Sequence, residues 1–153
     1  MPRKPAAGGG VYGAARYYVQ PNFFVGPEAG FMLLDINARN PDTAFGFVRT
    51  DAYVGGQAGV TFQGPGASKI NVYTGLDADW SRITVGVETA DERMSKTLGG
   101  WSVHGGVELQ PIPSIPTMWL GLDLRHSDVS GTIGGDPTHV QWNMLSVTLS
   151  IQH

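Results

Sequence analysis

Apolar and polar residues alternate along most of this chain, and the alternation is clearest in the stretch WSVHGGVELQ at residues 101–110. Trp101 and Val103 share one parity there, whereas His104 and Glu108 share the other. Successive side chains of a β-strand point to opposite faces of the sheet. The stretch therefore predicts a strand with one apolar face and one polar face.

Similar runs follow one another through the sequence, separated by glycine, proline and asparagine residues that favour turns. No helical pattern between them is long enough to connect parallel strands, so antiparallel pairing of successive strands is expected. Eight strands in up-and-down order are enough to close a small barrel. We therefore predict an all-β fold, with a flexible tail at residues 1–10 and one antiparallel barrel domain at residues 11–153. The predicted strands cover residues 11–20, 28–39, 43–63, 70–78, 82–88, 101–110, 118–125 and 140–152.

Several stretches break the simple alternation and predict irregular backbone. Residues 79–81 are expected to form a tight reversal between two strands, and bulges near residues 49–51 and 143–144 would restore the phase of their strands. Residues 89–99 are expected to form a surface loop or a single helical turn. Residues 127–139 contain three glycines and a proline and are expected to form a long loop.

The composition limits the classes of protein that fit this pattern. Charged residues make up 15% of the chain, against about 25% in an average soluble domain, so a water-facing surface would be poorly covered. The net charge of −3 gives no electrostatic reason to bind nucleic acid. The chain has no cysteine, which excludes disulfides and thiolate metal ligands. No run approaches the 18 or more apolar residues of a membrane helix, and residues 1–10 are not expected to be a signal peptide.

A barrel with one apolar and one polar face can be built in two ways. A soluble barrel turns the apolar face inward, whereas a membrane barrel turns it toward lipid and keeps the polar face in the lumen. The glycine-rich polar faces of this chain suit a narrow lumen, and their charges are of both signs and could pair there. We therefore predict a polar lumen and an apolar, lipid-facing exterior. The charges predicted to line the lumen are Arg16, Asp35, Arg39, Asp77, Arg82, Glu88, His104, Glu108, Asp123 and Arg125.

Aromatic residues lie near several of the predicted strand ends, as they do in the interfacial girdles of membrane barrels. The partners expected are membrane lipid or detergent, with a possible surface partner bound through loops 89–99 and 127–139. No cofactor and no nucleic acid are expected. The predicted interfacial aromatics are Tyr17, Tyr18, Trp80, Trp101 and Trp142.

The second half of the chain has the order and pattern of a known family. WSVHGGVELQ, a proline-rich turn, MWLGLDLRHSDVSG, a glycine loop and VQWNMLSVTLSI together resemble the C-terminal half of small eight-stranded outer-membrane β-barrel proteins of the OmpA/OmpX-like type. The resemblance covers roughly residues 68–152. It implies a bacterial outer-membrane location and a structural, adhesive or narrow-channel role without catalysis.

Two other functions remain open at this point. A soluble up-and-down barrel could bind a small apolar ligand, as lipocalins do. His126 and Ser127 invite comparison with outer-membrane lipid A deacylases, whose pattern resembles His-x-Ser; here the two residues are adjacent and should point to opposite faces. The four histidines, at positions 104, 126, 139 and 153, are too scattered in the sequence to predict a metal site.

Overall fold

The computed structural model is a single antiparallel β-sheet with one helical turn, η1 (Pro65–Ala67). It describes residues 7–36, 45–87, 93–112, 114–115, 117–133 and 135–151. Within these ranges no helix is long and apolar enough to cross a membrane. The strands are β1 (Ala7–Ala14), β2 (Tyr17–Gln20), β3 (Phe23–Ile36), β4 (Phe45–Gln63), β5 (Lys69–Val87), β6 (Arg93–Leu109), β7 (Met118–Ile133) and β8 (Asp136–Ile151).

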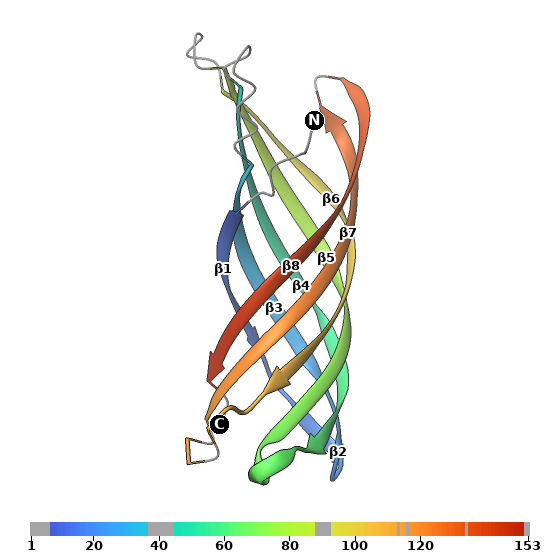
Figure 1. Ribbon diagram of the computed structural model, residues 1–153. Coiled ribbons are helices and arrows are strands. Elements are labelled where there is room, and N and C mark those ends of the chain that lie inside the picture. Colours follow the sequence, from blue (N-terminus) through green and yellow to red (C-terminus); the bar gives the residue numbers. More distant parts are fainter. Residues whose placement is uncertain are drawn as a thin grey trace.

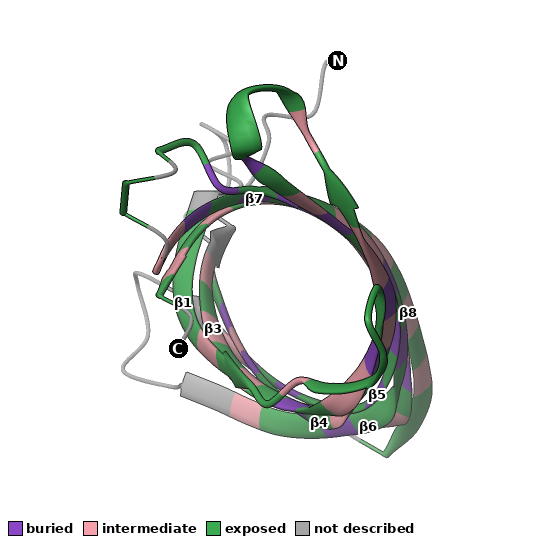
Figure 2. Ribbon diagram, turned by 90° about the horizontal axis from the view of Figure 1, so that it is seen from below, coloured by how far each residue is buried: buried purple, intermediate pink, exposed green. Residues whose placement is uncertain are grey.

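From β3 onward each strand pairs with the next in the sequence, which gives the order β1-β3-β4-β5-β6-β7-β8. β1 and β2 both pair with β3, and β2 extends the β1 edge along the start of β3. The strands are inclined to the long axis (Figure 1). Viewed along that axis, the sheet curls into a ring (Figure 2). This confirms the all-β, antiparallel, up-and-down sheet with a barrel-like curvature that the alternation predicts.

Two edges of the sheet are left without a hydrogen-bonded partner strand in the described part of the chain. β1 pairs only with β3, and β8 pairs only with β7. Six antiparallel pairings separate β1 from β8 in the sheet order. Because six is an even number, these two edge strands run in the same direction. β1 therefore begins at the end of the barrel opposite to the one where β8 finishes (Figure 1). We call the gap between β1 and β8 the seam.

Three of the predicted irregularities are wrong. β4 pairs with β3 and β5 without a register shift near residues 49–51. β5 continues through residues 79–81, where a reversal was expected, so the predicted strands 70–78 and 82–88 are one strand. β8 pairs with β7 without a shift at residues 143–144.

The errors on β5 and β8 have a common cause: the inward side chains change from polar to apolar along the barrel axis. Asp79 and Ser81 on β5 point inward and are buried, and the next inward side chain is Ile83. The apolar parity therefore changes along the strand while the backbone continues undisturbed. Ile83 belongs to an apolar interior cluster, which we call the apolar plug. The apolar plug consists of Ile83, Leu98, Val129, Ile133, Val140 and Trp142.

The predicted loops and tail are also shorter than expected. β6 begins at Arg93 and β7 reaches Ile133, so most of residues 89–99 and 127–139 form strands. Only two residues separate β7 from β8. Residues 7–10, assigned to the tail, pair with β3 as the first part of β1. Residues 89–99 and 127–139 have a polar composition because the strands that they contribute to have a polar outer face near the end of the barrel that holds the apolar plug.

Along the barrel axis the interior changes from polar to apolar, whereas the outer surface changes from apolar to polar. Over most of its height it carries exposed apolar side chains, which we call the apolar belt. Nearer the end of the barrel that holds the apolar plug, the outward positions of β5, β7 and β8 become polar, as at Arg82, Asp128 and Gln141, whereas Val48 of β4 remains apolar. Described residues of the belt include Phe31, Leu33, Val54, Val72, Leu76, Trp80, Trp101, Val103, Val107, Leu109, Leu120, Leu122, Leu124, Leu145, Val147, Leu149 and Ile151.

Candidate functional site

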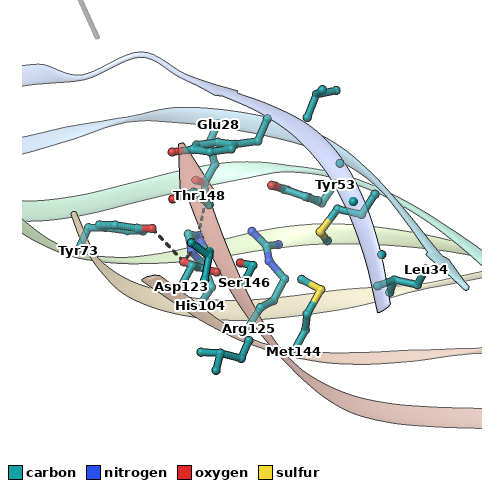
Figure 3. Close-up of a pocket in the computed structure, with 18 residues that line it drawn as sticks. Glu28, Leu34, Tyr53, Tyr73, His104, Asp123, Arg125, Met144, Ser146 and Thr148 are labelled. Carbon is teal, nitrogen blue, oxygen red and sulfur yellow. Dashed lines mark hydrogen bonds and ion pairs between the residues drawn. The ribbon is translucent and has the colours of Figure 1, made fainter. Parts of the chain in front are cut away.

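A buried polar group fills the middle of the barrel around His104 of β6. His104 Nε2 contacts the carboxylate of Glu28 on β3, and Nδ1 lies 3.0 Å from Asp123 Oδ2 on β7. The hydroxyl of Tyr73 on β5 donates to the same Asp123 oxygen at 3.1 Å. Side chains from β3, β5 and β7 therefore gather around the imidazole that β6 carries (Figure 3).

Arg125 extends this group along β7. Its Nη1 donates to Asp77 Oδ2 at 2.6 Å and to Ser102 Oγ at 2.9 Å. The guanidinium also lies 3.8 Å from the centroid of the Tyr53 ring, which stacks against the cation. Asp77 Oδ2 is in turn 3.7 Å from His104 Nε2. The Arg125 and His104 contacts therefore form one connected cluster, which we call the central cluster.

Toward the end where β8 finishes, a second group is built on Glu108 of β6. Arg16, in the break between β1 and β2, donates from Nη1 to Glu108 Oε2 at 2.7 Å. The hydroxyl of Tyr12 donates to Oε1 at 3.1 Å, and the amide of Asn71 donates to Oε2 at 3.3 Å. Glu108 has no solvent exposure, so its charge depends on these donors.

On the other side of the central cluster lies a third group, formed by Arg49 and Asp51 of β4. Arg49 Nε donates to Asp51 Oδ1 at 2.7 Å, and Ser81 Oγ contacts the same oxygen. The Arg49 guanidinium lies against the ring of Trp142, at the border of the apolar plug. The interior thus passes from two polar groups through this ion pair to an apolar end.

A pocket of about 400 Å³ connects the central cluster to the seam. Its inner wall includes Glu28, His104 and Asp123 (Figure 3). Its outer wall is formed by residues 8–12 of β1 and residues 144–148 of β8, including belt residues of the outer face. The pocket therefore crosses the barrel wall where the two edge strands are not hydrogen-bonded.

The structure brings most of the predicted lumen charges together in the interior. Arg82 is an exception: it is exposed on the outer face of β5 and donates from Nε to Ser95 Oγ at 2.6 Å. The prediction failed because it placed a reversal just before this residue. Asp35, Arg39 and Glu88 lie outside the residues whose side chains are described. The charges found inside are Arg16, Asp77, His104, Glu108, Asp123 and Arg125.

The predicted aromatic residues separate into two sets. Tyr17, Trp80 and Trp101 are exposed, and so is Tyr18, whose hydroxyl lies 3.2 Å from Thr61 Oγ1. Trp142 was predicted to lie at the outer surface, and this is wrong: its side chain packs in the apolar plug. From Thr138 onward the even positions of β8 are the more buried ones, and among them Val140 and Trp142 pack in the apolar plug.

His126 and Ser127 point to opposite faces of β7, as their adjacency predicts. His126 Nδ1 lies 2.8 Å from Asn143 Oδ1 on the outer face, whereas the Ser127 side chain is buried in the interior. The imidazole is therefore not placed to take a proton from the hydroxyl.

Sequence reasoning missed Glu28, Arg49 and Asp51 as interior residues. Glu28 was placed at the start of a strand without a role, although it is a lone charge in an apolar run. A charge at an inward position of such a run is the signal that could have identified it. Its partner, His104, is 76 positions away in the sequence, and no local spacing indicates the pair.

No family model matches this chain, and no curated protein or solved structure matches it. The function must therefore be inferred from the fold and from the arrangement of its interior and exterior residues.

Proposed function

We propose that this protein is a β-barrel of the bacterial outer membrane, anchored in lipid by the apolar belt, with a structural or adhesive role and no catalysis. The observation that carries the proposal is the inverted placement of residues within the belt: charges are buried inside while leucines and valines are exposed outside. A soluble barrel has the opposite arrangement, because water favours an apolar interior. Lipid favours the arrangement found here.

The edge of the apolar belt supports this proposal. The last apolar residue before the polar region is Trp80 on β5, Trp101 on β6, Leu124 on β7 and Leu145 on β8. From β5 to β7 this edge moves diagonally along the pairing, because Trp101 pairs with Ala78 and Leu124 pairs with Gly105, whereas Leu145 of β8 pairs with Leu124 itself. On strands inclined to the axis, a diagonal along the pairing becomes a level line around the barrel (Figure 1). A level edge is what a flat membrane surface requires.

The height of the belt is also suitable. On β5 the apolar outward positions run from Ile70 to Trp80, interrupted by Thr74. A tilted strand needs about 9 to 11 residues to cross the hydrocarbon core of a bilayer. Trp80 and Trp101 then lie at one interface, where indole rings are favoured.

The interior favours a closed barrel over an open channel. Three ion-paired groups and the apolar plug follow one another along the axis. A surface partner would contact the polar outer faces of β6, β7 and β8 beyond the belt, around residues 93–99 and 127–139. This gives the barrel a role as an anchor that presents a short polar rim.

The two alternatives are less well supported. A lipocalin-like barrel would offer a cavity without buried charges, whereas the pocket here combines apolar side chains with the charged groups of Glu28, Asp123 and Arg125. A deacylase-like hydrolase would need His126 and Ser127 on one face, and they lie on opposite faces.

Single-cysteine labelling tests the proposal, since the chain has no cysteine of its own. A fluorophore at Leu122→Cys or Leu145→Cys should be quenched by spin-labelled lipid in vesicles and protected from aqueous iodide. The matched controls, Ser130→Cys and Gln141→Cys, lie on the outer faces of the same two strands beyond the belt. They should show the reverse. Equal iodide quenching at all four positions would mean that the belt faces water, and the membrane proposal would be wrong.

A further inference from the structure

We propose that Glu28, Asp77 and His104 bind one divalent transition-metal cation, Zn²⁺ or an ion of the same class, inside the barrel. Their ligand atoms all lie within 4.8 Å of one another, and all three side chains are buried. One imidazole nitrogen and carboxylate oxygens form a donor set that Zn²⁺ and its neighbours bind. This site goes beyond the proposed anchoring role and does not depend on it.

The orientation of His104 is that of a metal ligand. Its Nε2 faces the carboxylates of Glu28 and Asp77, while Nδ1 is held by Asp123 Oδ2 at 3.0 Å. Metal-bound histidines usually donate their second ring N–H to a carboxylate, which fixes the tautomer and aims the free nitrogen at the ion. Asp123 is therefore a positioning residue, and Tyr73 in turn holds Asp123.

One buried carboxylate oxygen of the same cluster lacks an N–H donor, which favours a cation-binding site. Asp77 Oδ2 accepts from Arg125, whereas Oδ1 receives no hydrogen bond from an N–H group of the described residues, and the Asp77 carboxyl lies against that of Glu28. The Asp77 side chain has no solvent exposure, so bulk water does not donate a hydrogen bond to this oxygen. A buried carboxylate oxygen without an N–H donor costs free energy that a bound cation would recover.

The charge balance of the interior also supports a cation, because negative side chains are in excess there. Among the residues whose side chains are described, the buried carboxylates outnumber the cationic side chains that reach them even with His104 protonated. A divalent ion at the central cluster would offset this excess in a region of low dielectric. The buried carboxylates are Glu28, Asp51, Asp77, Asp79, Glu108 and Asp123, and the cations that pair with them are Arg16, Arg49, Arg125 and His104.

Two glycines leave room for the donor atoms. A Cβ on Gly75 would meet His104 Nε2 and would lie 2.7 Å from Glu28 Oε1, and a Cβ on Gly55 would meet Asp77 Oδ1. Any larger residue at either position would therefore occupy the space of the ligands. The pocket at the seam adds volume next to the cluster and a route by which an ion can enter.

Binding should be measured on the folded, metal-stripped full chain in detergent, titrated with Co²⁺ for its visible d–d absorption and with Zn²⁺ in competition. We expect one Co²⁺ per chain, displaced by Zn²⁺. His104→Ala should abolish the absorption, because it removes the nitrogen ligand. The matched control is the double variant His126→Ala/His139→Ala, which removes two histidines of the outer face. It should bind as the unchanged protein does.

Asp123→Asn keeps the proposed ligands and tests the site even if His104→Ala does not fold. It should weaken Co²⁺ binding by about 10- to 100-fold, the usual effect of removing the partner of a ligating histidine. Circular dichroism monitors the β-structure of each variant. The proposal is overturned if the folded, unchanged protein binds no stoichiometric Co²⁺ or Zn²⁺. It is also overturned if binding survives both His104→Ala and Asp123→Asn, or is lost in the double histidine control.

Discussion

At the scale of single residues, stability depends on charges that are buried and paired, as Glu108 illustrates. Its carboxylate accepts from Arg16, Tyr12 and Asn71 and has no solvent exposure. A buried ion pair is weak evidence of stabilisation as a whole, but removing one partner is costly because the other charge stays unpaired.

We therefore expect Glu108→Ala to lower the free energy of unfolding by about 3 to 5 kcal/mol, because it leaves the Arg16 guanidinium without its ion-pair partner. Urea unfolding in lipid vesicles measures the change. The control is Asp136→Ala, at an exposed position at the start of β8. Its effect should stay within about 0.5 kcal/mol. Similar losses for the two variants would show that the Glu108 group does not hold the interior together.

Gly75 allows a second prediction at this scale, because its missing side chain makes room for the central cluster. Gly75→Ala should cost about 1 to 3 kcal/mol by overpacking, since the new methyl group meets His104 and Glu28. Gly99→Ala is the matched control: it lies on the outer side of the neighbouring strand, with no atom within 4 Å of the added Cβ. Thermal unfolding of both variants tests this. If Gly75→Ala is no less stable than Gly99→Ala, the cluster is loosely packed.

At the scale of the strand, β7 carries both environments on one outer face. Leu122 lies in the apolar belt, and Ser130 lies beyond it on the same side of the strand. Under the proposed function, Leu122→Arg should cost about 2 to 4 kcal/mol in lipid, because a charge near the bilayer midplane has neither water nor a partner. Ser130→Arg should be nearly neutral. Unfolding in vesicles gives both values, and a mild Leu122→Arg would place the belt in water.

The strands also show how far sequence alone could go. Within the apolar belt the two faces differ strongly, and parity correctly placed Asp77, His104 and Arg125 in the interior. Beyond the belt the interior becomes apolar and the exterior polar, so parity alone suggested a reversal near Arg82 and an outer position for Trp142. An alternation of period two shows that the two faces of a strand differ in polarity, but it does not show which face points into the barrel.

The central cluster could be predicted only in part, for a different reason. His104, Asp77 and Asp123 were identified one by one as interior residues, but their mutual contacts depend on strand register and on reach across the lumen. The cluster joins Glu28 of β3 to His104 of β6, and the two strands between them carry Gly55 and Gly75 at the facing positions. Alternation contains no information on such contacts across a barrel.

At the scale of the whole molecule, the seam is the least stabilised part of the wall. The outer edges of β1 and β8 have no hydrogen-bonded neighbour in the described chain, and exposed backbone groups are costly in lipid. Amide hydrogen exchange in vesicles should therefore be faster along β8 than along β7, which pairs on both sides for much of its length. Equal protection of β7 and β8 would show that the seam closes in lipid through an additional pairing.

The interior as a whole predicts how the barrel responds to an ion gradient. From one end to the other, a solute would meet the Glu108 group, the central cluster, the Arg49–Asp51 pair and the apolar plug. Barrels of about eight strands leave only enough room for side chains, so passage would require breaking buried ion pairs and hydrating apolar residues. Planar-bilayer recordings of the folded protein should therefore show no steady conductance. Leu98→Ser, which adds a polar group to the apolar plug, should leave the bilayer equally silent, since the ion-paired groups remain. A stable, large and ion-selective conductance would contradict the closed interior and would favour a narrow channel whose filter is the central cluster.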